Sequence, residues 1–333
     1  MEEDKYGTHK KSGFVPKNYI SYGPLFAWPM QPLRLLKWLP SYFLPWNVLF
    51  VIMGVAYWYY LMPPLEEMKT FQLGWISYLL GVNMAAVILW YGAWHGWLYI
   101  LKRQGTRYKY NARWPSNNNE VFLFKRQNVD NVIWSLCSGV PIFTAWMVLS
   151  FWLFANGYIP YLDPIENPGW FAVILLLTPL FGEVHFYVVH RILHFPTLYK
   201  YIHSLHHNNV NPGPWSGLSM HPVEHVFYFC GIVMIALCNA HPIHMISYAI
   251  RVSLGPAIGH VGFDKVEVGK EAKLNSEYYA HYLHHKLFEV NYADGVVPLD
   301  KWFGSFHDGS PEAEELLRAR MRKRKEALAA KSA

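Results

Sequence analysis

The stretch FYVVHRILHFPTLYKYIHSLHH, residues 186–207, places five histidines at helical spacing behind an apolar run. It contains the motifs HRILH at 190–194 and HSLHH at 203–207, and a second HxxHH motif, HYLHH, follows at 281–285. Residues at i, i+3 and i+4 share one face of a helix, so we expect each motif to direct two or three imidazoles at one point. The histidines in these motifs are His190, His194, His203, His206, His207, His281, His284 and His285.

Metal binding is the chemistry that this pattern favours, because neutral imidazole is a good ligand for iron, copper, zinc and nickel. Eight ligands exceed the four that zinc usually takes, so we predict two metal ions, each held by four or five histidines. His221 and His260 are the next candidate ligands, and His225 is either a ligand or a hydrogen-bond donor behind one. The histidines that lack the spacing, and are expected in the core, are His95, His185, His241 and His244.

A second metal motif overlaps this region. His221-Pro222-Val223-Glu224-His225 matches the HxxEH pattern of some zinc peptidases, in which two histidines bind zinc and the glutamate is the base. That hypothesis leaves the other clustered histidines without a role. The chain has no GxSxG elbow, no Walker loop and no GxGxxG after a strand, so we expect electrons for any redox chemistry to come from another protein.

The composition indicates a membrane protein. Of the 333 residues, 53% are hydrophobic and only 16% are charged, whereas soluble domains average about 25% charged residues. None of the three cysteines forms a CxxC pair, so a disulfide scaffold is not expected. The net charge of +6 is attributed to basic loops that orient the protein in the membrane. No nucleic-acid partner is expected.

Uncharged runs predict the transmembrane helices. Expected spans are 46–62, 73–101, 131–159 and 169–189, and the apolar stretch 226–258, broken at 239–242, is expected to form a helical hairpin. Residues 22–45 contain five prolines and are expected to be interfacial.

Loop charges predict the orientation. The loop at 102–130 is strongly basic, while loops 63–72 and 160–168 are short and net acidic. Basic loops stay in the cytoplasm, so the count of spans places the histidine motifs at the cytoplasmic face. No cleaved signal peptide is expected in MEEDKYGTHKK.

The expected fold is therefore an all-α integral membrane protein with about four transmembrane helices, a helical hairpin and a helical cap that carries the histidine motifs. We divide it into an N-terminal cytoplasmic or interfacial segment (1–45), transmembrane helices (46–182), a metal-binding domain (183–308) and a basic C-terminal helix (309–333).

The order of the motifs resembles the sterol desaturase/fatty acid hydroxylase superfamily. That family shows FYxxHRxxH, LYxxxHxxHH, HPxE and HxxHH, followed by NYG and a segment ending in FG. The resemblance covers about 183–308. It departs from the pattern at Gly182-Glu183, where many members have an acid pair, and at Ala293, where they have the glycine of NYG. The other segments of this chain that match the family pattern are Phe186-Tyr187, Leu198-Tyr199, His221-Pro222-Val223-Glu224, Asn291-Tyr292 and Trp302-Phe303-Gly304.

The resemblance implies a membrane-bound, non-haem di-iron oxygenase that uses O2 to hydroxylate or desaturate a lipid, with a sterol-type lipid as the first expectation. It implies two iron ions on the eight motif histidines, and electrons from a cytochrome b5 or ferredoxin-type partner that draws on NAD(P)H. Acidic residues are expected to orient the imidazoles. The candidates are Glu183, Glu224, Asp264 and Asp308.

Several alternatives stay open at this point. The substrate is alternatively a fatty acyl chain, a sphingolipid or a glyceryl ether, and the protein is alternatively a metal transporter. Neither the oxidised position nor the choice between hydroxylation and desaturation follows from the motifs, and the membrane is either the endoplasmic reticulum or a bacterial inner membrane. Basic residues near the motifs could meet an acidic electron carrier or lipid headgroups. They are Arg191, Lys265, Lys286 and Lys301.

Overall fold

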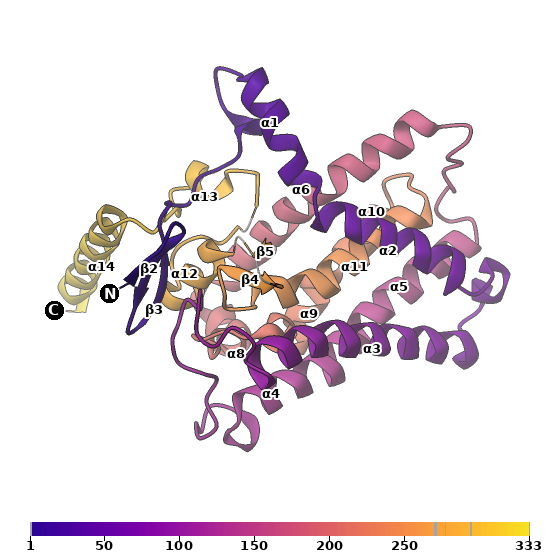
Figure 1. Ribbon diagram of the computed structural model, residues 1–333. Helices are drawn as coiled ribbons and strands as arrows, with labels where there is room; N and C mark the ends of the chain where they lie inside the picture. Colours follow the sequence, from indigo (N-terminus) through magenta and orange to yellow (C-terminus); the bar gives the residue numbers. More distant parts are fainter. Residues whose placement is uncertain (1, 270–271, 277, 294, 333) are drawn as a thin grey trace.

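The computed structural model describes residues 2–269, 272–276, 278–293 and 295–332, and Figure 1 shows them as a helical bundle with a smaller mixed region at one end. The α-helices are α1 (Pro32–Phe43), α2 (Trp46–Tyr60), α3 (Leu73–His95), α4 (Gln127–Trp134), α5 (Val140–Ala155), α6 (Pro168–Leu193), α7 (Pro196–Leu198), α8 (Ser204–His207), α9 (Pro222–Phe229), α10 (Gly231–Ala236), α11 (Pro242–Gly259), α12 (Tyr279–Leu287), α13 (Leu299–Trp302) and α14 (Pro311–Ser332). Short π-helical turns lie at Gly96–Ile100, Ser135–Gly139 and Tyr199–His203, and 3-10 turns at Pro24–Phe26, Leu65–Lys69, Leu123–Lys125 and Pro214–Leu218.

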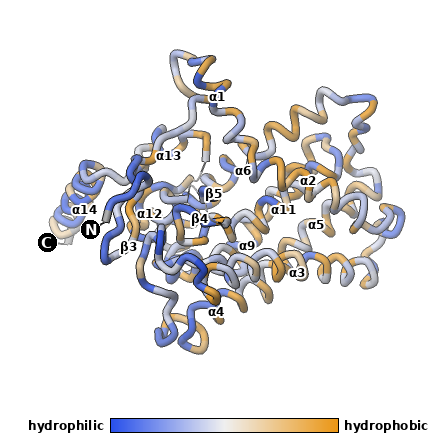
Figure 2. Tube along the Cα trace, viewed as in Figure 1, coloured by the Kyte–Doolittle hydropathy of each residue, from blue (hydrophilic) through white to orange (hydrophobic). Residues whose placement is uncertain are grey.

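Within the described residues, three helical stretches are long and apolar enough to cross a membrane: Leu73–Ile100, Gln127–Ala155 and Pro168–Leu193. They correspond to the second, third and fourth predicted spans, and Figure 2 colours much of their length as hydrophobic. The 15 residues of α2 are fewer than the roughly 20 that a span needs. Helix α2 reaches that length only together with α1, from which it is bent by 45°. The protein is an integral membrane protein, but the predicted span at 46–62 is not a separate long helix.

Helix α11 forms the centre of the bundle, where it packs against α2, α3, α5 and α6 (Figure 1). Most of its side chains are buried, and α2 approaches it closely at Gly54. A Cβ atom at Gly54 would lie 2.2 Å from Ser247 Oγ, so only glycine permits this approach. Small residues at a helix contact are what allow close packing inside a membrane.

A polar contact joins three helices inside the bundle. Asn83 on α3 accepts a hydrogen bond from the Tyr57 hydroxyl on α2 at 2.7 Å and donates one to Thr144 Oγ1 on α5 at 2.9 Å. Polar side chains among apolar helices need such partners, because lipid offers none.

The expected hairpin at 226–258 is present. Helices α9 and α10 lead away from the mixed end, and α11 returns toward it (Figure 1). His241 begins α11 as its N-cap, because its Nδ1 accepts a hydrogen bond from Ile243 N at 3.0 Å. His244 Nε2 donates to the carbonyl of Phe171 at 2.9 Å, so both histidines have structural roles, as expected.

The mixed end contains strands as well as helices, which differs from the purely helical cap that the sequence predicted. Strands β1 (Glu2–Glu3), β2 (Gly7–Lys10) and β3 (Gly13–Pro16) form one antiparallel sheet, and β4 (Lys265–Val268) and β5 (Ala272–Asn275) form another. Such short strands leave only a weak pattern in the sequence, because a few alternating residues cannot be told from a loop.

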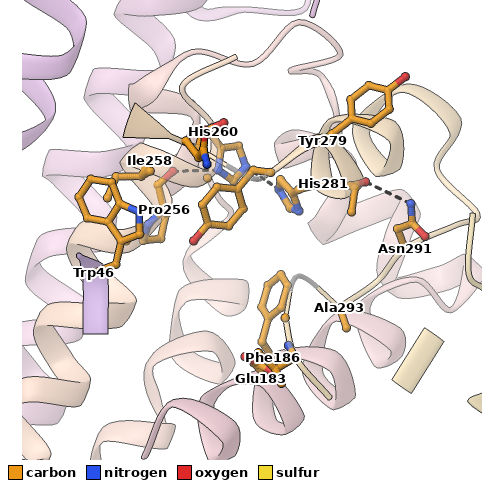
Figure 3. A pocket seen from close by; sticks show the side chains of 18 of the residues that line it. Trp46, Glu183, Phe186, Pro256, Ile258, His260, Tyr279, His281, Asn291 and Ala293 are labelled. Atoms are coloured by element: carbon orange, nitrogen blue, oxygen red, sulfur yellow. Dashed lines mark hydrogen bonds between the residues drawn. The ribbon is translucent and has the colours of Figure 1, made fainter. Parts of the chain in front are cut away.

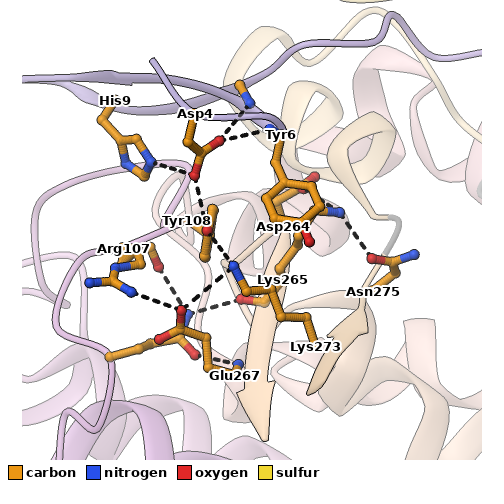
Figure 4. Close-up of polar contacts among 12 residues, drawn as sticks. Asp4, Tyr6, His9, Arg107, Tyr108, Asp264, Lys265, Glu267, Lys273 and Asn275 are labelled. Carbon is orange, nitrogen blue, oxygen red and sulfur yellow. Dashed lines mark hydrogen bonds and ion pairs between the residues drawn. The ribbon is translucent and has the colours of Figure 1, made fainter. Parts of the chain in front are cut away.

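Polar contacts hold this end together (Figure 4). The hydroxyl of Tyr108 donates to Asp4 Oδ2 at 2.9 Å and accepts from Lys273 Nζ at 2.6 Å, while Arg107 pairs with Glu267 at 3.0 Å. The N-terminal sheet, the basic loop after α3 and the β4–β5 hairpin are therefore one packed unit.

Candidate metal centre

Nine histidines converge on two points at the mixed end of the bundle. Within each group the potential ligand atoms all lie within 4.8 Å of one another. Group A consists of His190, His194, His203, His207 and His284. Group B consists of His206, His260, His281 and His285.

Each HxxHH motif is divided between the two groups. On the second motif, His203 and His207 belong to group A and His206 to group B, while on the third, His284 belongs to group A and His281 and His285 to group B. Neighbouring residues on a helix point about 100° apart, so the last two histidines of a motif diverge. Each HxxHH motif therefore directs two of its histidines at one group and the third at the other.

Four structural elements supply these side chains. His190 and His194 lie at the end of α6, directly behind a candidate span, and His260 follows the last residue of α11. The second motif occupies the π-helical turn Tyr199–His203 and α8, and the third lies on α12. Both groups therefore lie where the bundle meets the mixed end.

The distances between ring nitrogens fit coordination of a metal ion. In group A, His207 Nε2 lies 3.2 Å from His194 Nε2 and 3.1 Å from His284 Nε2. In group B, His281 Nε2 lies 2.9 Å from His260 Nε2 and 3.1 Å from His285 Nε2. At these spacings the ring nitrogens are close enough together to be ligands of one metal ion in each group.

The opposite ring nitrogens set the tautomer of the imidazoles. Nδ1 of four histidines faces a backbone carbonyl, which can only accept, so Nδ1 carries the hydrogen and Nε2 keeps its lone pair. The pairs are His190 with Tyr292 O at 2.8 Å, His206 with Ser219 O at 3.1 Å, His260 with Pro256 O at 3.0 Å and His284 with Val290 O at 2.7 Å.

Glu224 fixes a fifth ring. Its Oε1 lies 2.8 Å from His203 Nδ1, and the side chain is only 3% exposed. Burial raises the pKa of the Glu224 carboxyl, whereas a cation on the far side of His203 favours the carboxylate. A carboxylate that accepts a hydrogen bond from Nδ1 orients the ring of a histidine whose Nε2 binds a metal ion.

Burial holds several of these imidazoles neutral. Burial lowers the pKa of His206 to about 3 and lowers the pKa values of His203 and His284 well below 6.5. Neutral imidazole is the form that binds metal.

Two buried nitrogens test whether a metal fits. His190 Nε2 and His203 Nε2 have no hydrogen-bond partner in the described part of the chain, and both belong to group A. Converging lone pairs without a hydrogen between them repel each other unless a cation lies among them. The residues therefore fit one metal ion in each group.

Other predicted site residues lie outside the two groups. His221 is not in either group: its Nδ1 accepts a hydrogen bond from Val223 N at 3.2 Å and begins α9. His225 is also outside, with Nδ1 3.0 Å from Ser138 Oγ and Nε2 3.1 Å from the carbonyl of Leu218.

The remaining acidic candidates contact other parts of the chain. Glu183 Oε2 accepts hydrogen bonds from Val296 N at 2.7 Å and Val297 N at 2.9 Å, so it holds the loop after Tyr292. Asp264 accepts from the Tyr110 hydroxyl, and Asp308 accepts from Ser310 N.

Sequence reasoning missed Asp300. This buried carboxylate accepts hydrogen bonds from Tyr292 N, Ala293 N and Ser305 Oγ at 2.9, 2.7 and 2.6 Å. It thereby holds the backbone whose Tyr292 carbonyl orients His190. The only signal in the sequence was an acidic residue between two motifs. Asp300 accepts mainly from backbone N–H groups, which every residue type offers, so no side-chain pattern marks its role.

A cavity of about 920 Å³ reaches the histidines. Figure 3 shows His260 and His281 on one wall, with Glu183 and Phe186 opposite and Trp46 at the side. The cavity extends from there to the bend between α1 and α2. Its size and mixed lining suit a lipid-sized ligand.

Comparison with known proteins identifies the region that carries this site. Residues 175–305 match the family model described as fatty acid hydroxylase. The match includes all nine histidines of groups A and B, so the matched region contains the whole candidate metal centre.

Curated proteins that are similar to this chain include sterol-modifying enzymes. A Delta(7)-sterol 5(6)-desaturase of Gibberella zeae is 27% identical over 58% of this chain and 60% of its own length. Another from Aspergillus fumigatus is 29% identical over 44% and 52%, and methylsterol monooxygenase 1 of Gallus gallus is 32% identical over 44% and 51%. The chain thus spans between half and 60% of these relatives. No solved structure matches.

Proposed function

We propose that this protein is a membrane-bound, O2-dependent oxygenase that hydroxylates or desaturates a sterol-type lipid, with one iron ion in each histidine group. The observation that carries the proposal is the division of nine histidines, eight of them buried, into two groups with metal-ligand spacing beside a lipid-sized cavity. The sterol class is supported by the relatives, which include sterol 5(6)-desaturases and a methylsterol monooxygenase.

The chain's residues would bind and orient the reaction components. When bound, two reduced iron ions would supply electrons to O2 and so turn it into an oxidant strong enough for an unactivated C–H bond. The histidines would hold these ions, and Glu224 and four backbone carbonyls would keep five of the imidazoles in the binding tautomer. Phe186 and Trp46 line the cavity and would exclude water from the apolar part of the lipid.

We propose further that the site faces the cytoplasm. The basic loop after α3 lies at the same end as the histidines, because Lys109 pairs with Phe263 in a β-bridge close to His260. Basic loops remain on the cytoplasmic side of a membrane. The electron donor, a cytochrome b5 or ferredoxin-type protein supplied by NAD(P)H, would then reach the site from the cytoplasm, in the endoplasmic reticulum or a bacterial inner membrane.

The geometry disfavours the zinc hydrolase hypothesis. In HPVEH, both ring nitrogens of His225 have hydrogen-bond partners, and Glu224 contacts His203 rather than a site beside His221. The transporter hypothesis predicts a site near the bilayer midplane, whereas both groups lie at one end of the bundle, beyond or at the end of the candidate spans.

Metal analysis of paired histidine variants tests the proposal. Wild-type protein purified anaerobically in detergent is expected to contain two irons per chain. His207→Ala removes a group A ligand and His206→Ala a group B ligand, although the residues are adjacent. Each variant is therefore expected to lose iron mainly from its own group, with different Mössbauer spectra for the iron that remains.

His221→Ala is the matched control, because this histidine lies outside both groups. It is expected to keep both irons. Zinc in place of iron, retained in His207→Ala and lost in His221→Ala, would overturn the proposal. Sterol analysis of cells that express the wild type completes the test: oxidised or newly unsaturated sterols are expected, and are expected to be absent with His207→Ala.

A further inference from the structure

Arg251 places a permanent positive charge inside the helical bundle. It lies midway along α11, between Gly182 on α6 and Asn47 on α2: a Cβ at Gly182 would lie 4.0 Å from Arg251 Nε, and Nη1 donates to Asn47 Oδ1. Arginine stays protonated in proteins and offers five N–H donors. The other donors of Arg251 form no hydrogen bond within the described part of the chain.

The nearby acids are engaged elsewhere. Glu183 follows Gly182 directly, yet its carboxylate accepts from the backbone of Val296 and Val297, and Glu224 contacts His203. Among the described residues no carboxylate forms an ion pair with Arg251. A charged side chain among membrane helices is costly without a partner, and such residues usually contact a ligand path.

The Arg251 side chain lines the same cavity as His260 and His281. It precedes His260 by nine residues, which is about 13 Å along a helix. Tyr42, Pro45 and Asn47 at the bend between α1 and α2 line the cavity beside it. The cavity therefore has the histidines at one end and an uncompensated cation at the other.

We propose that Arg251 binds an oxygen atom of the lipid that occupies this cavity, and so selects an amphiphilic lipid and fixes its direction. The inference deepens the proposed function, on which it rests for the identity of that lipid as the substrate. The recognised chemistry is a hydrogen-bond-accepting oxygen, supplied by a hydroxyl or a carboxylate. A guanidinium can donate hydrogen bonds to either group. The lipid oxygen would accept from the Arg251 donors that have no acceptor among the described residues.

Binding of paired lipids that differ only in oxygen tests this inference. The probes are 5α-cholestan-3β-ol against 5α-cholestane, and oleate against cis-9-octadecene, measured under argon with purified protein in nanodiscs. Wild type is expected to bind the oxygenated member of one pair about tenfold or more tightly, as a hydrogen bond to a charged group provides. The pair that shows the preference identifies the source as hydroxyl or carboxylate.

Arg251→Gln is expected to reduce that preference to nearly one while the hydrocarbon binds as before. Asn47→Asp places a carboxylate against Arg251 and is expected to have the same effect without lowering the unfolding temperature. A merely structural arginine would be better satisfied in Asn47→Asp and would leave lipid binding unchanged. Arg103→Gln, at the exposed end of a span, is the matched control and is expected to bind like wild type.

The inference is overturned if wild type shows no preference in either pair, or if both variants keep it. Iron content is measured on the same samples, and no turnover is required. A protein that lacks iron or oxygenase activity but keeps the Arg251-dependent preference would contradict only the proposed function. Full iron content and activity with no such preference would contradict only the role of Arg251.

Discussion

At the scale of single residues, the site depends on which atom each imidazole presents. Helical spacing places the histidines, but the tautomer comes from the acceptor behind each ring. Four of these acceptors are backbone carbonyls, and the fifth is the carboxylate of Glu224. Among the described residues the two groups contain no carboxylate, and Glu224 supplies a negative charge in contact with one of their histidines.

Glu224→Gln tests this charge, because it keeps an oxygen that accepts from His203 but removes the negative charge. We expect iron affinity to fall by about 10–100-fold, the usual effect of losing a partner behind a metal ligand. The measurement is anaerobic competition with an iron chelator. Glu289→Gln, a substitution at a surface ion pair with Arg324, serves as the control. Equal affinities in the three proteins would contradict the assignment.

At the scale of elements, α11 connects the membrane bundle to the site. It packs against four helices, carries Arg251 and ends directly before His260 of group B. Its contact with α2 depends on Gly54, where a side chain would meet Ser247. The position of His260 therefore depends on packing far from any metal ligand.

Gly54→Val is expected to lower stability by about 1–3 kcal/mol, because the added methyl groups force α2 away from α11. Thermal unfolding in detergent measures the change. Gly81→Val on α3 is the matched control, since nothing lies within 4 Å of a Cβ there and both substitutions add the same side chain to a helix. Equal shifts in the two variants would show that close packing at Gly54 is unimportant.

At the scale of the whole molecule, buried neutral histidines at one end link stability to pH. Burial lowers the folded-state pKa of His206 to about 3, below the value of about 6.5 for an unfolded histidine. Below about pH 6.5 the unfolded chain binds protons that the folded chain does not, so stability falls as the pH falls.

We expect the metal-free protein to lose about 1.4 kcal/mol for each pH unit between about pH 6.5 and 3 through His206. Unfolding temperatures measured at several values between about pH 7 and 5 are expected to fall, and to fall less for His206→Ala. If the unfolding temperature of His206→Ala falls with pH as steeply as that of the wild type, the neutral state of His206 is contradicted. Iron is expected to leave the loaded protein over the same range, because protons compete for the same nitrogens.

The sequence alone was sufficient to predict the ligand residues and the long apolar helices. Eight of the nine grouped histidines lie in three motifs at helical spacing, and uncharged runs predicted the stretches that became α3, α5 and α6. Both signals are local: helical spacing places residues on one face, and apolar length sets what can cross a membrane. The superfamily followed from the order of the same motifs and is supported by the match over 175–305.

Only the tertiary structure decided how these residues are shared. It divided each HxxHH motif between two groups, included His260, left out His221, and placed Glu224 rather than Glu183 behind a histidine. The physical reason is that each of these results depends on contacts between distant segments, such as His207 with His284, which are 77 residues apart. Spacing within a motif determines which side chains point together, but packing of helices determines what they point at.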